Sequence, residues 1–472
     1  MCGIAGICYS KDAAILIARM LHALQHRGQE AAGAVSREIS KNGIHFYEHR
    51  APGLVGDTLA REEVTRQLHG DAALGHVRYS TAGPKHTAHA SQVADAQPLL
   101  REGVALVHNG NLTNHLILRK ELEGQGARFQ TKVDSEVILK LIGRGEADTL
   151  TNRVCDALTR IEGAFALIIL SKKKLIGIRD PLGIRPLVLG RVGDGYAFAS
   201  ETCAFDIVRG EVVDEVAPGE MVVIEDNEVR RINYASVTPE RPSRPCIFEY
   251  IYFSRPDSEW GDKNMYLARS RLGKQLAREE IARGTDLDLF GDDTIVVPVL
   301  DSGLPAAIGY AHQAHLRFSP ALVRNHYAVG RSFIEPTQFL RDLKVLLKHN
   351  ANKALVRGMR VILIDDSAVR GTTSRLIVEM IRSAGAREVH LRIASAPITH
   401  ACFHGIDTNR GELLAAGCED LEEANERLRK ASGADSVAYL SHANMVRAVR
   451  CSSQCDACFS GDYPTPLTDL QT

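Results

Sequence analysis

A cysteine at position 2 is the first residue of this sequence that could do chemistry. The chain opens with MCGIAGICYS, and a second residue this small allows Met1 to be removed. Removal would leave Cys2 with a thiol and a free α-amine, whose reference pKa near ~7.7 lets it accept the thiol proton at neutral pH. A nucleophile and its base would then sit on one residue, ready to attack a carbonyl. The alternative interpretation is a small packing residue at the start of a strand.

A second candidate site is a phosphate-binding loop in VILIDDSAVRGTTS. An apolar strand runs directly into Asp365 and Asp366. After a short loop, an amphipathic helix begins at four small residues, Gly371, Thr372, Thr373 and Ser374. Small residues let backbone N–H groups approach a phosphate at the positive end of a helix, and the two carboxylates suit ribose hydroxyls or Mg²⁺. An Asp-rich turn before an ordinary helix N-cap is the alternative.

The cysteines form a third candidate site. Ten cysteines in 472 residues are too sparse for a disulfide scaffold. The tail CSSQCDACFSGDYP contains Cys451, Cys455 and Cys458, and Cys246 and Cys402 lie earlier in the chain. A C-x-x-C pair with further thiols can bind zinc or an iron–sulfur cluster, and spacing alone does not separate the two. Unliganded surface thiols are the alternative.

Composition limits the class of protein. The formal net charge is −1 and basic residues are spread along the chain, so there is no electrostatic footprint for nucleic acid or an anionic membrane. The longest apolar run, AFALIILS, has the length of a buried strand, well short of the ~18 residues of a membrane span. The start of the chain does not resemble a signal peptide. We expect a globular, cytoplasmic protein with neither nucleic acid nor membrane as partner.

The elements that must position these residues fall into two halves. Residues 2–236 contain short β-type runs such as GAFALIILS, KLIGIRD and EMVVIED, with few helical patterns such as AILIARMLHALQHRG. This pattern predicts an α+β domain of stacked, mostly antiparallel sheets with helices. Residues 246–472 alternate strand and helix from DTIVVPVL to EVHLRIAS, which predicts an α/β domain with a parallel sheet. Three prolines in VTPERPSRP predict a linker over residues 237–245.

Together these motifs resemble those of one enzyme family. VILIDDSAVRGTTS is similar to the 5-phosphoribosyl 1-diphosphate motif of type I phosphoribosyltransferases. CGIAGI, LQHRGQE, GHVRYSTAG, RPCIFEYIYFSRPDS and GRSFIEPTQ resemble the amidophosphoribosyltransferases over nearly the whole chain. The resemblance implies an N-terminal-nucleophile glutaminase domain (class II glutamine amidotransferase) followed by a type I phosphoribosyltransferase domain.

The resemblance also implies the reaction. Cys2 hydrolyses L-glutamine to glutamate and ammonia, and the ammonia displaces pyrophosphate from 5-phosphoribosyl 1-diphosphate, giving 5-phosphoribosylamine in the first committed step of purine synthesis.

For the glutaminase domain, the resemblance gives roles to four further residues. Arg78 binds the glutamine carboxylate, which suits a guanidinium fork, and Asp134 binds its ammonium group. The Asn109 side chain and the Gly110 N–H bind the oxyanion formed on attack. Arg27 in LQHRGQE either positions the nucleophile or is structural.

For the second domain, the resemblance implies a Mg²⁺ site and a substrate site. The Mg²⁺ ligands are Ser302, Asp365 and Asp366, and the substrate contacts are Arg331, Lys348, Arg370, Gly371, Thr372, Thr373 and Ser374. The sequence departs from the family pattern at three positions: Leu300 replaces a proline, Leu346 a basic residue and His349 a leucine. Loss of one cation predicts weaker substrate binding.

The resemblance also assigns most of the clustered cysteines. One branch of the family carries a 4Fe-4S cluster at the positions of Cys246, Cys402, Cys455 and Cys458, which leaves Cys451 without a role. It further implies a homotetramer, with purine nucleotides as candidate inhibitors.

The residues by themselves leave two other functions open. A glutamine-dependent aminotransferase acting on a sugar phosphate would share the first domain and lack VILIDDSAVRGTTS. A nucleotide-sensing regulatory protein would keep the second domain, without a need for Cys2, Arg78 and Asp134.

Overall fold

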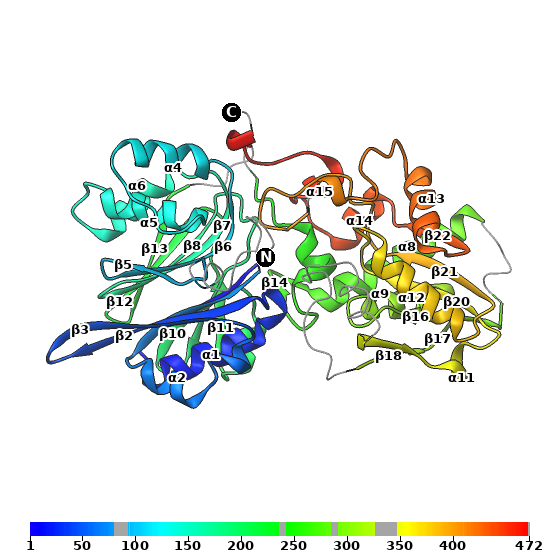
Figure 1. Cartoon of the computed structure of the whole chain (residues 1–472), viewed down its shortest axis with the longest axis horizontal. Coiled ribbons are helices and arrows are strands. Elements are labelled where there is room, and N and C mark those ends of the chain that lie inside the picture. Colours follow the sequence, from blue (N-terminus) through cyan, green and yellow to red (C-terminus); the bar gives the residue numbers. More distant parts are fainter. Residues whose placement is uncertain are drawn as a thin grey trace.

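The chain folds into two lobes that meet close to its N-terminus (Figure 1). The computed structural model describes residues 1–79, 93, 95–235, 242–284, 291–325, 347–408 and 410–470. Arg331, Leu346 and linker residues 237–241 lie outside the described residues.

The first lobe is built on two stacked sheets. One has the strand order β11-β9-β10-β1-β4-β2-β3, with β1 (Gly3–Cys8), β2 (Ala31–Ser40), β3 (Gly43–Pro52), β4 (Ala72–Arg78), β9 (Val188–Val192), β10 (Gly195–Ala199) and β11 (Glu211–Glu215). The other has the order β13-β12-β8-β7-β6-β5, with β5 (Leu99–Arg101), β6 (Val104–Leu112), β7 (Gly163–Leu170), β8 (Lys174–Arg179), β12 (Glu220–Glu225) and β13 (Glu228–Asn233). All neighbouring strands are antiparallel, as predicted.

Strand β7 shows why the sheets stack. All of its residues are buried, because successive side chains of a strand point to opposite faces and both faces are covered. Ile168 packs between the sheets with Ile4 and Phe198. Leu167 packs on the other face against a layer of helices, α4 (His115–Gly124), α5 (Asp134–Arg144) and α6 (Leu150–Leu158). Helices α1 (Ala13–Ala23), α2 (Glu62–Gln67) and α7 (Cys203–Asp206) cover the outer face of the other sheet.

The second lobe contains the predicted parallel sheet. Its order is β17-β16-β20-β21-β22, with β16 (Thr294–Pro298), β17 (Arg317–Phe318), β20 (Arg360–Asp365), β21 (Glu388–Ile393) and β22 (Ser436–Tyr439). One face packs against α8 (Met265–Arg283), α9 (Leu304–Ala314) and α14 (His442–Val449), the other against α12 (Thr372–Ser383) and α13 (Leu421–Ser432). The shorter elements are η1 (Gln25–Arg27), η2 (Val55–Asp57), η3 (Glu249–Phe253), β14 (Glu259–Trp260), β15 (Lys263–Asn264), β18 (Leu322–Arg324), β19 (His349–Ala351), α11 (Lys353–Val356), η6 (Arg410–Glu412), α15 (Ala457–Ser460) and η7 (Thr468–Leu470).

The C-terminal segment ties the second lobe to the first. After α15 the chain crosses over and reaches η7 beside α4 (Figure 1). The Asp469 carboxylate accepts hydrogen bonds from the N–H groups of Leu116 (3.0 Å) and Ile117 (3.2 Å) in the first turn of α4. Because first-turn N–H groups have no partner within a helix, this carboxylate caps α4 from the far end of the chain.

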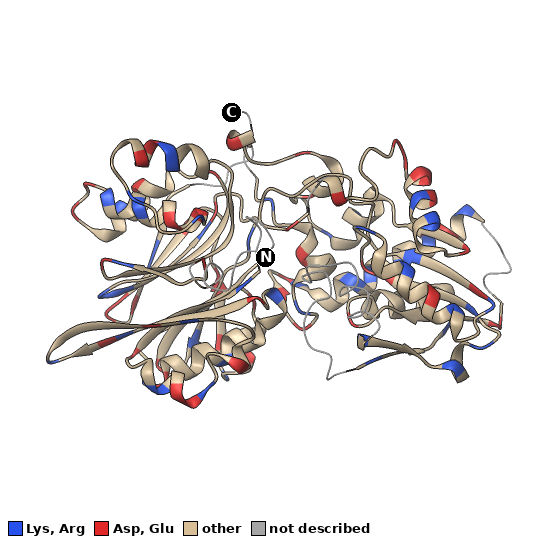
Figure 2. Cartoon of the chain, in the orientation of Figure 1, with Lys and Arg blue, Asp and Glu red and all other residues tan. Residues whose placement is uncertain are grey.

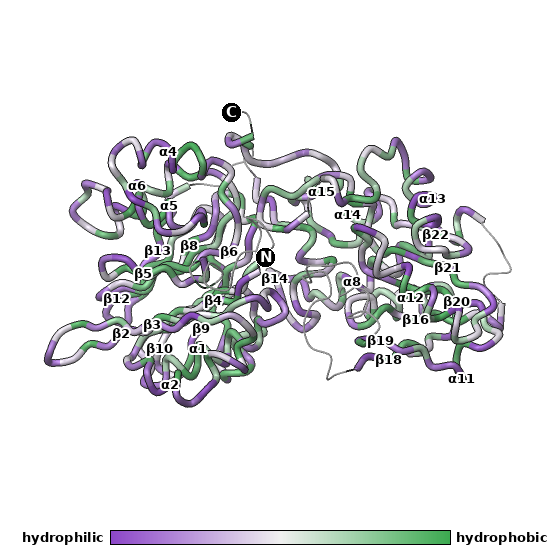
Figure 3. The backbone as a smooth tube through the Cα atoms, in the orientation of Figure 1, coloured by the Kyte–Doolittle hydropathy of each residue, from purple (hydrophilic) through white to green (hydrophobic). Residues whose placement is uncertain are grey.

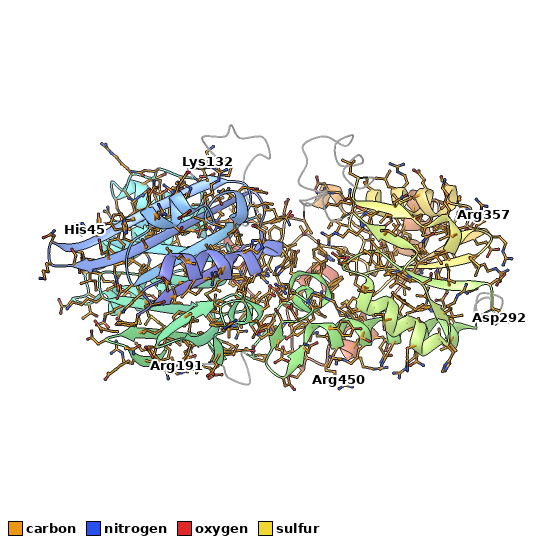
Figure 4. The ribbon with its side chains drawn as sticks, turned by 90° about the horizontal axis from the view of Figure 1, so that it is seen from below. His45, Lys132, Arg191, Asp292, Arg357 and Arg450 are labelled. Atoms are coloured by element: carbon orange, nitrogen blue, oxygen red, sulfur yellow. The ribbon has the colours of Figure 1, made fainter. Side chains whose placement is uncertain are left out.

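Charged residues are spread over both lobes (Figure 2), whereas hydrophobic residues are concentrated in the sheets (Figure 3). Lys and Arg are interspersed with Asp and Glu on both lobes (Figure 2), and the strands inside each lobe are largely hydrophobic (Figure 3). His45 and Arg191 lie on the periphery of the first lobe, away from the junction (Figure 4). Among the described residues, no helix is both long and apolar enough to cross a bilayer.

Candidate active sites

A cavity of about 50 Å³ in the first lobe gathers most of the predicted glutaminase residues. Cys2 directly precedes β1, Arg78 ends β4, Gly110 lies in β6 and Asp134 begins α5, so four elements converge there. The other residues that line it are His76, Tyr79, Asp95, Gln97, His108, Asn111, His115 and Val133. Sequence reasoning assigned no role to these eight, although His76, Tyr79, His108 and Asn111 are neighbours of the predicted residues in the same motifs.

Cys2 is fixed on three sides. Its N–H donates to Asn109 Oδ1 (3.2 Å), its carbonyl accepts from Arg27 Nε (2.9 Å), and its thiol lies 3.5 Å from the Tyr79 carbonyl oxygen. Asn109 is fully buried, and its Nδ2 has no hydrogen-bond partner among the described residues. A buried amide donor without a partner next to a nucleophile is placed to bind the oxyanion that attack creates.

Gly110 is the residue that the backbone requires at its position. Its φ is +149°, and a Cβ there would overlap the carbonyl oxygen of Ala164 on β7. A side chain would therefore push β6 away from β7 and displace the N–H that sequence analysis assigns to the oxyanion.

Asp134 and Arg78 give the cavity an anion and a cation, and Asp95, whose Oδ2 lies 3.8 Å from Arg78 Nη2, is a second carboxylate in its lining. Burial opposes the charged form of Asp134, but nearby His108 and the Leu112 N–H, which donates at 3.0 Å, outweigh it and lower the pKa of Asp134 below its usual range. Arg78 is nearly buried, and its Nη1 has no hydrogen-bond partner among the described residues. An anion and an unpaired guanidinium donor in one small cavity suit the ammonium and carboxylate of an α-amino acid.

Arg27 connects this site to the second lobe. Its guanidinium is fully buried and pairs with Glu201 at 2.5 Å and bidentately with Glu249 at 2.8 and 3.0 Å. Because its Nε also donates to Cys2, Arg27 is at once structural and positioning, the two roles that sequence analysis left open. Glu249 was not predicted, although it lies within the motif RPCIFEYIYFSRPDS, because no spacing rule relates it to Arg27.

A larger cavity, of about 620 Å³, lies at the carboxyl ends of β16 and β20. The predicted residues that line it are Ser302, Lys348, Asp365, Asp366, Arg370, Gly371, Thr372, Thr373 and Ser374. Arg255, Arg269 and Arg324 line it too and were not predicted, although Arg255 lies within the motif RPCIFEYIYFSRPDS. His26, Gln29 and Tyr79 of the first lobe complete its wall, so this cavity reaches the junction between the lobes.

The two adjacent acids in this cavity suit a divalent cation. Asp365 ends β20, and Asp365 and Asp366 are 6% and 5% exposed. Neither is within ion-pair distance of a basic side chain that the structure describes, and burial, followed by the charge of Asp366, raises the pKa of Asp365 well above its usual value. Buried carboxylates without a cationic partner form an oxygen-rich donor set of the kind that Mg²⁺ takes.

Two of the three departures from the family pattern touch each other in this cavity. His349 Nε2 lies 3.0 Å from the carbonyl oxygen of Leu300. The two unusual residues therefore occur at one contact, and their effect on substrate affinity stays a prediction.

The four cysteines assigned by resemblance come together in the second lobe. Cys246 and Cys455 are joined by backbone hydrogen bonds, from the Ile247 N–H to the Cys455 carbonyl (3.1 Å) and from the Cys455 N–H to the Pro245 carbonyl (2.9 Å). Burial, together with the neighbouring thiols of this group, raises the pKa of Cys246 to about 11 and that of Cys458 well above its usual value. Within the described residues, no three His, Cys, Asp or Glu side chains are placed to hold a single metal ion.

Comparison with known proteins matches a domain family to each lobe. The glutamine amidotransferase domain family matches residues 85–206, and the phosphoribosyl transferase domain family matches residues 270–397. The amidophosphoribosyltransferase of Rhizobium etli is 44% identical over 99% of this chain and 92% of its own length. That of Bacillus subtilis is 41% identical over 99% of this chain and 94% of its own. The chain belongs to the amidophosphoribosyltransferase family.

Solved structures of amidophosphoribosyltransferases share the whole arrangement. The B. subtilis glutamine phosphoribosylpyrophosphate amidotransferase, complexed with ADP and GMP, has a TM-score of 0.84 at 39% identity and covers 98% of each chain. A structure described as the allosteric regulatory enzyme of purine biosynthesis has a TM-score of 0.85 at 40% identity over 98% of this chain and 96% of its own. The predicted fold and the predicted enzymatic activity, glutamine-dependent amidophosphoribosyl transfer in purine synthesis, are thereby confirmed.

Proposed function

We propose that Cys2 is the nucleophile of the glutaminase half-reaction. After removal of Met1, the α-amine of Cys2 takes the thiol proton as sulfur attacks the glutamine amide carbon. The Asn109 Nδ2 and the Gly110 N–H stabilise the oxyanion, while Arg78 and Asp134 orient the amino acid. Ammonia leaves, and water hydrolyses the thioester to glutamate. The buried, unpartnered amide donor of Asn109 beside Cys2 is the observation that carries this proposal.

In the second half-reaction, ammonia attacks C1 of 5-phosphoribosyl 1-diphosphate and pyrophosphate leaves. Ser302, Asp365 and Asp366 would hold Mg²⁺, which neutralises charge on the leaving pyrophosphate when bound. Lys348 supplies a cation to the cavity, and the first turn of α12, with Arg370 and residues 371–374 around it, offers N–H groups and hydroxyls to phosphate. Arg331 remains a proposed contact from the sequence.

We also propose a 4Fe-4S cluster on Cys246, Cys402, Cys455 and Cys458. Backbone hydrogen bonds on either side of Cys246 join its segment to Cys455, and burial, together with the charges of Cys402, Cys246 and Cys455, raises the pKa of Cys458 well above its usual value, so the four cysteines lie near one another. Four neighbouring thiolates are the donor set that such a cluster takes. Such a cluster would tie the C-terminal tail to the second lobe.

Metal analysis tests the cluster directly. Anaerobically purified chain should contain about four iron and four sulfide per chain, and Cys458→Ser should lose most of both. Cys451→Ser is the matched control, because Cys451 lies in the same tail, beside Tyr250, and is assigned no iron. One zinc per chain with no iron would contradict the assignment.

The two half-reactions are tested in one tube. Glutamate release is followed with Mg²⁺ and glutamine, with and without 5-phosphoribosyl 1-diphosphate, while pyrophosphate is measured in parallel. Both products should rise together when both substrates are present, and Cys2→Ala should abolish glutamate release while ammonium still supports pyrophosphate release. A Cys2→Ala variant that keeps its glutaminase activity would remove Cys2 from the mechanism. If the parent chain releases neither glutamate nor pyrophosphate, the nucleotide-sensing function would be favoured instead.

Three further properties are proposed on resemblance. We expect a homotetramer, a cytoplasmic location, and binding of purine nucleotides, since the similar B. subtilis enzyme is complexed with ADP and GMP. Light scattering and nucleotide inhibition of pyrophosphate release test the first and the last.

A further inference from the structure

The C-terminal segment of the chain reaches the glutamine cavity through one side-chain contact. His115, the first residue of α4, lines this cavity. Its Nδ1 lies 3.1 Å from Asp469 Oδ2, and the two side chains are 18% and 8% exposed. Asp469 belongs to η7, which lies beside α4 (Figure 1). A residue near the end of the chain therefore stands directly behind the wall of the cavity.

Backbone contacts fix Asp469 in this place. Its N–H donates to the Thr113 carbonyl oxygen at 2.8 Å. Its carboxylate accepts from the N–H groups of Leu116 and Ile117, which have no partner within their helix. Asp469 is thus bound to the turn between β6 and α4 independently of His115, and its carboxylate can hold the imidazole in one place.

Two acceptors hold the His115 ring at the same nitrogen. Nδ1 lies 3.0 Å from the Leu112 carbonyl oxygen as well as 3.1 Å from Asp469 Oδ2. Carbonyl and ionised carboxylate oxygens only accept hydrogen bonds, so Nδ1 carries a hydrogen. The ring cannot turn over without losing both contacts. The imidazole therefore has one orientation in the wall of the glutamine cavity.

The same turn fixes the acid that is assigned to the ammonium group of glutamine. The Leu112 carbonyl faces His115, and the Leu112 N–H donates to Asp134 Oδ2 at 3.0 Å. Asp134 and His115 both line the cavity. Contacts therefore run without a break from the tail, through His115 and Leu112, to the carboxylate that faces the substrate.

We propose that Asp469 and His115 are positioning residues that set the affinity of the first lobe for the α-amino group of glutamine. Asp469 fixes the imidazole, the imidazole holds the Leu112 peptide, and the Leu112 N–H fixes Asp134. The inference rests on the proposed function of Cys2 and on the ammonium-binding role of Asp134. It assigns a part of the glutamine site to the C-terminal segment.

The test compares glutamine with glutaramate, which is glutamine without its α-amino group. In Asp469→Ala and in His115→Ala the KM for glutamine should rise about 5- to 10-fold, with kcat within about twofold of the parent. The rise should be equal with and without 5-phosphoribosyl 1-diphosphate. The inhibition constant of glutaramate against glutamine hydrolysis should stay within about twofold, because this ligand makes no ammonium contact. General loosening of the cavity would weaken both ligands.

The double variant tests the order of the contacts. If Asp469 acts through His115, adding Asp469→Ala to His115→Ala should change the KM for glutamine by less than about twofold. The cap of α4 stays in place in His115→Ala. That variant therefore decides the question even if Asp469→Ala fails to fold.

Matched controls come from the same tail and the same lobe. Asp462→Ala removes an exposed carboxylate of the C-terminal segment, which pairs with Arg244 at 2.9 Å. His45→Ala removes an exposed imidazole of the first lobe. Both should keep the parent's KM for glutamine and its inhibition constant for glutaramate.

Three results would overturn the inference and leave the proposed function intact. The first is an unchanged KM for glutamine in His115→Ala. The second is an equal weakening of glutamine and glutaramate, which gives the two residues only a stabilising role. The third is a double variant in which the two single effects multiply. A parent chain that does not hydrolyse glutamine at all would overturn the proposed function, and this inference with it.

Discussion

Arg27 in the first lobe and Glu249 in the second form a fully buried, bidentate ion pair with N···O distances of 2.8 and 3.0 Å. The same guanidinium donates to the carbonyl oxygen of Cys2 at 2.9 Å. The backbone of the proposed nucleophile is therefore held through a side chain that the other lobe fixes. Docking of the two lobes and placement of the thiol depend on one set of contacts.

Breaking this pair should damage the glutaminase more than the transferase. Glu249→Gln leaves Arg27 buried with one carboxylate fewer, which we expect to lower stability by about 3 kcal/mol and the glutamine-dependent kcat by about 10-fold. Ammonia-dependent pyrophosphate release should change by less than about twofold. Glu121→Gln is the control, since it breaks an exposed ion pair in which Arg160 Nη2 donates to both carboxylate oxygens of Glu121. Equal losses in the two activities would show that Glu249 only stabilises the fold.

Arg78 should determine glutamine affinity. Arg78→Gln removes the guanidinium with the unpaired Nη1, and we expect the KM for glutamine to rise about 10- to 100-fold. Steady-state glutamate release measures this, with Arg66→Gln, an exposed arginine, as control. An unchanged KM would place the amino acid carboxylate elsewhere.

Replacement of Asp365 should stabilise the fold and reduce transferase activity. Because burial and Asp366 raise the pKa of Asp365 well above its usual value, the folded chain holds this charge unfavourably at pH 7 without a cation. Asp365→Asn should therefore raise the melting temperature in Mg²⁺-free buffer and reduce pyrophosphate release by at least about 100-fold. Asp262→Asn, at an exposed ion pair with Lys263, should do neither. A lower melting temperature for Asp365→Asn would argue against a strained carboxylate pair.

His76 should make stability depend on pH. Burial, with Arg78 and His108 nearby, keeps the pKa of His76 well below its usual 6.5. Below that pH the unfolded chain binds a proton that the folded chain does not, so the free energy of unfolding falls as the pH drops from 6.5 toward the folded pKa. His76→Asn should flatten this slope by about 1.4 kcal/mol per pH unit between about pH 6 and 5.

Urea unfolding at several pH values measures that slope. His45→Asn is the control, because His45 is exposed at the edge of the first lobe (Figure 4). A slope that His76→Asn leaves unchanged would show that His76 does not contribute to the pH dependence.

The sequence determined the local features of this protein. The apolar run of β20, the two acids after it and the small residues that start α12 are contiguous, and each acts through the conformation of its own segment. A fully apolar β7 likewise required a layer on each face. Motifs of this kind predicted both domains, both substrates and several residues of each cavity.

The tertiary structure decided which residues from distant parts of the chain contact one another. Arg27 and Glu249 are 222 residues apart, and Asn111 and Phe403 are 292 apart, so no period or spacing relates them. Arg255, Arg269 and Arg324 reach the larger cavity from three different segments. The periodicity of a sequence records which face of one element is buried, while contacts between elements depend on how all the layers pack. The hydrogen bond from Asn111 to the Phe403 carbonyl is such a contact, which is why only the folded chain displays it.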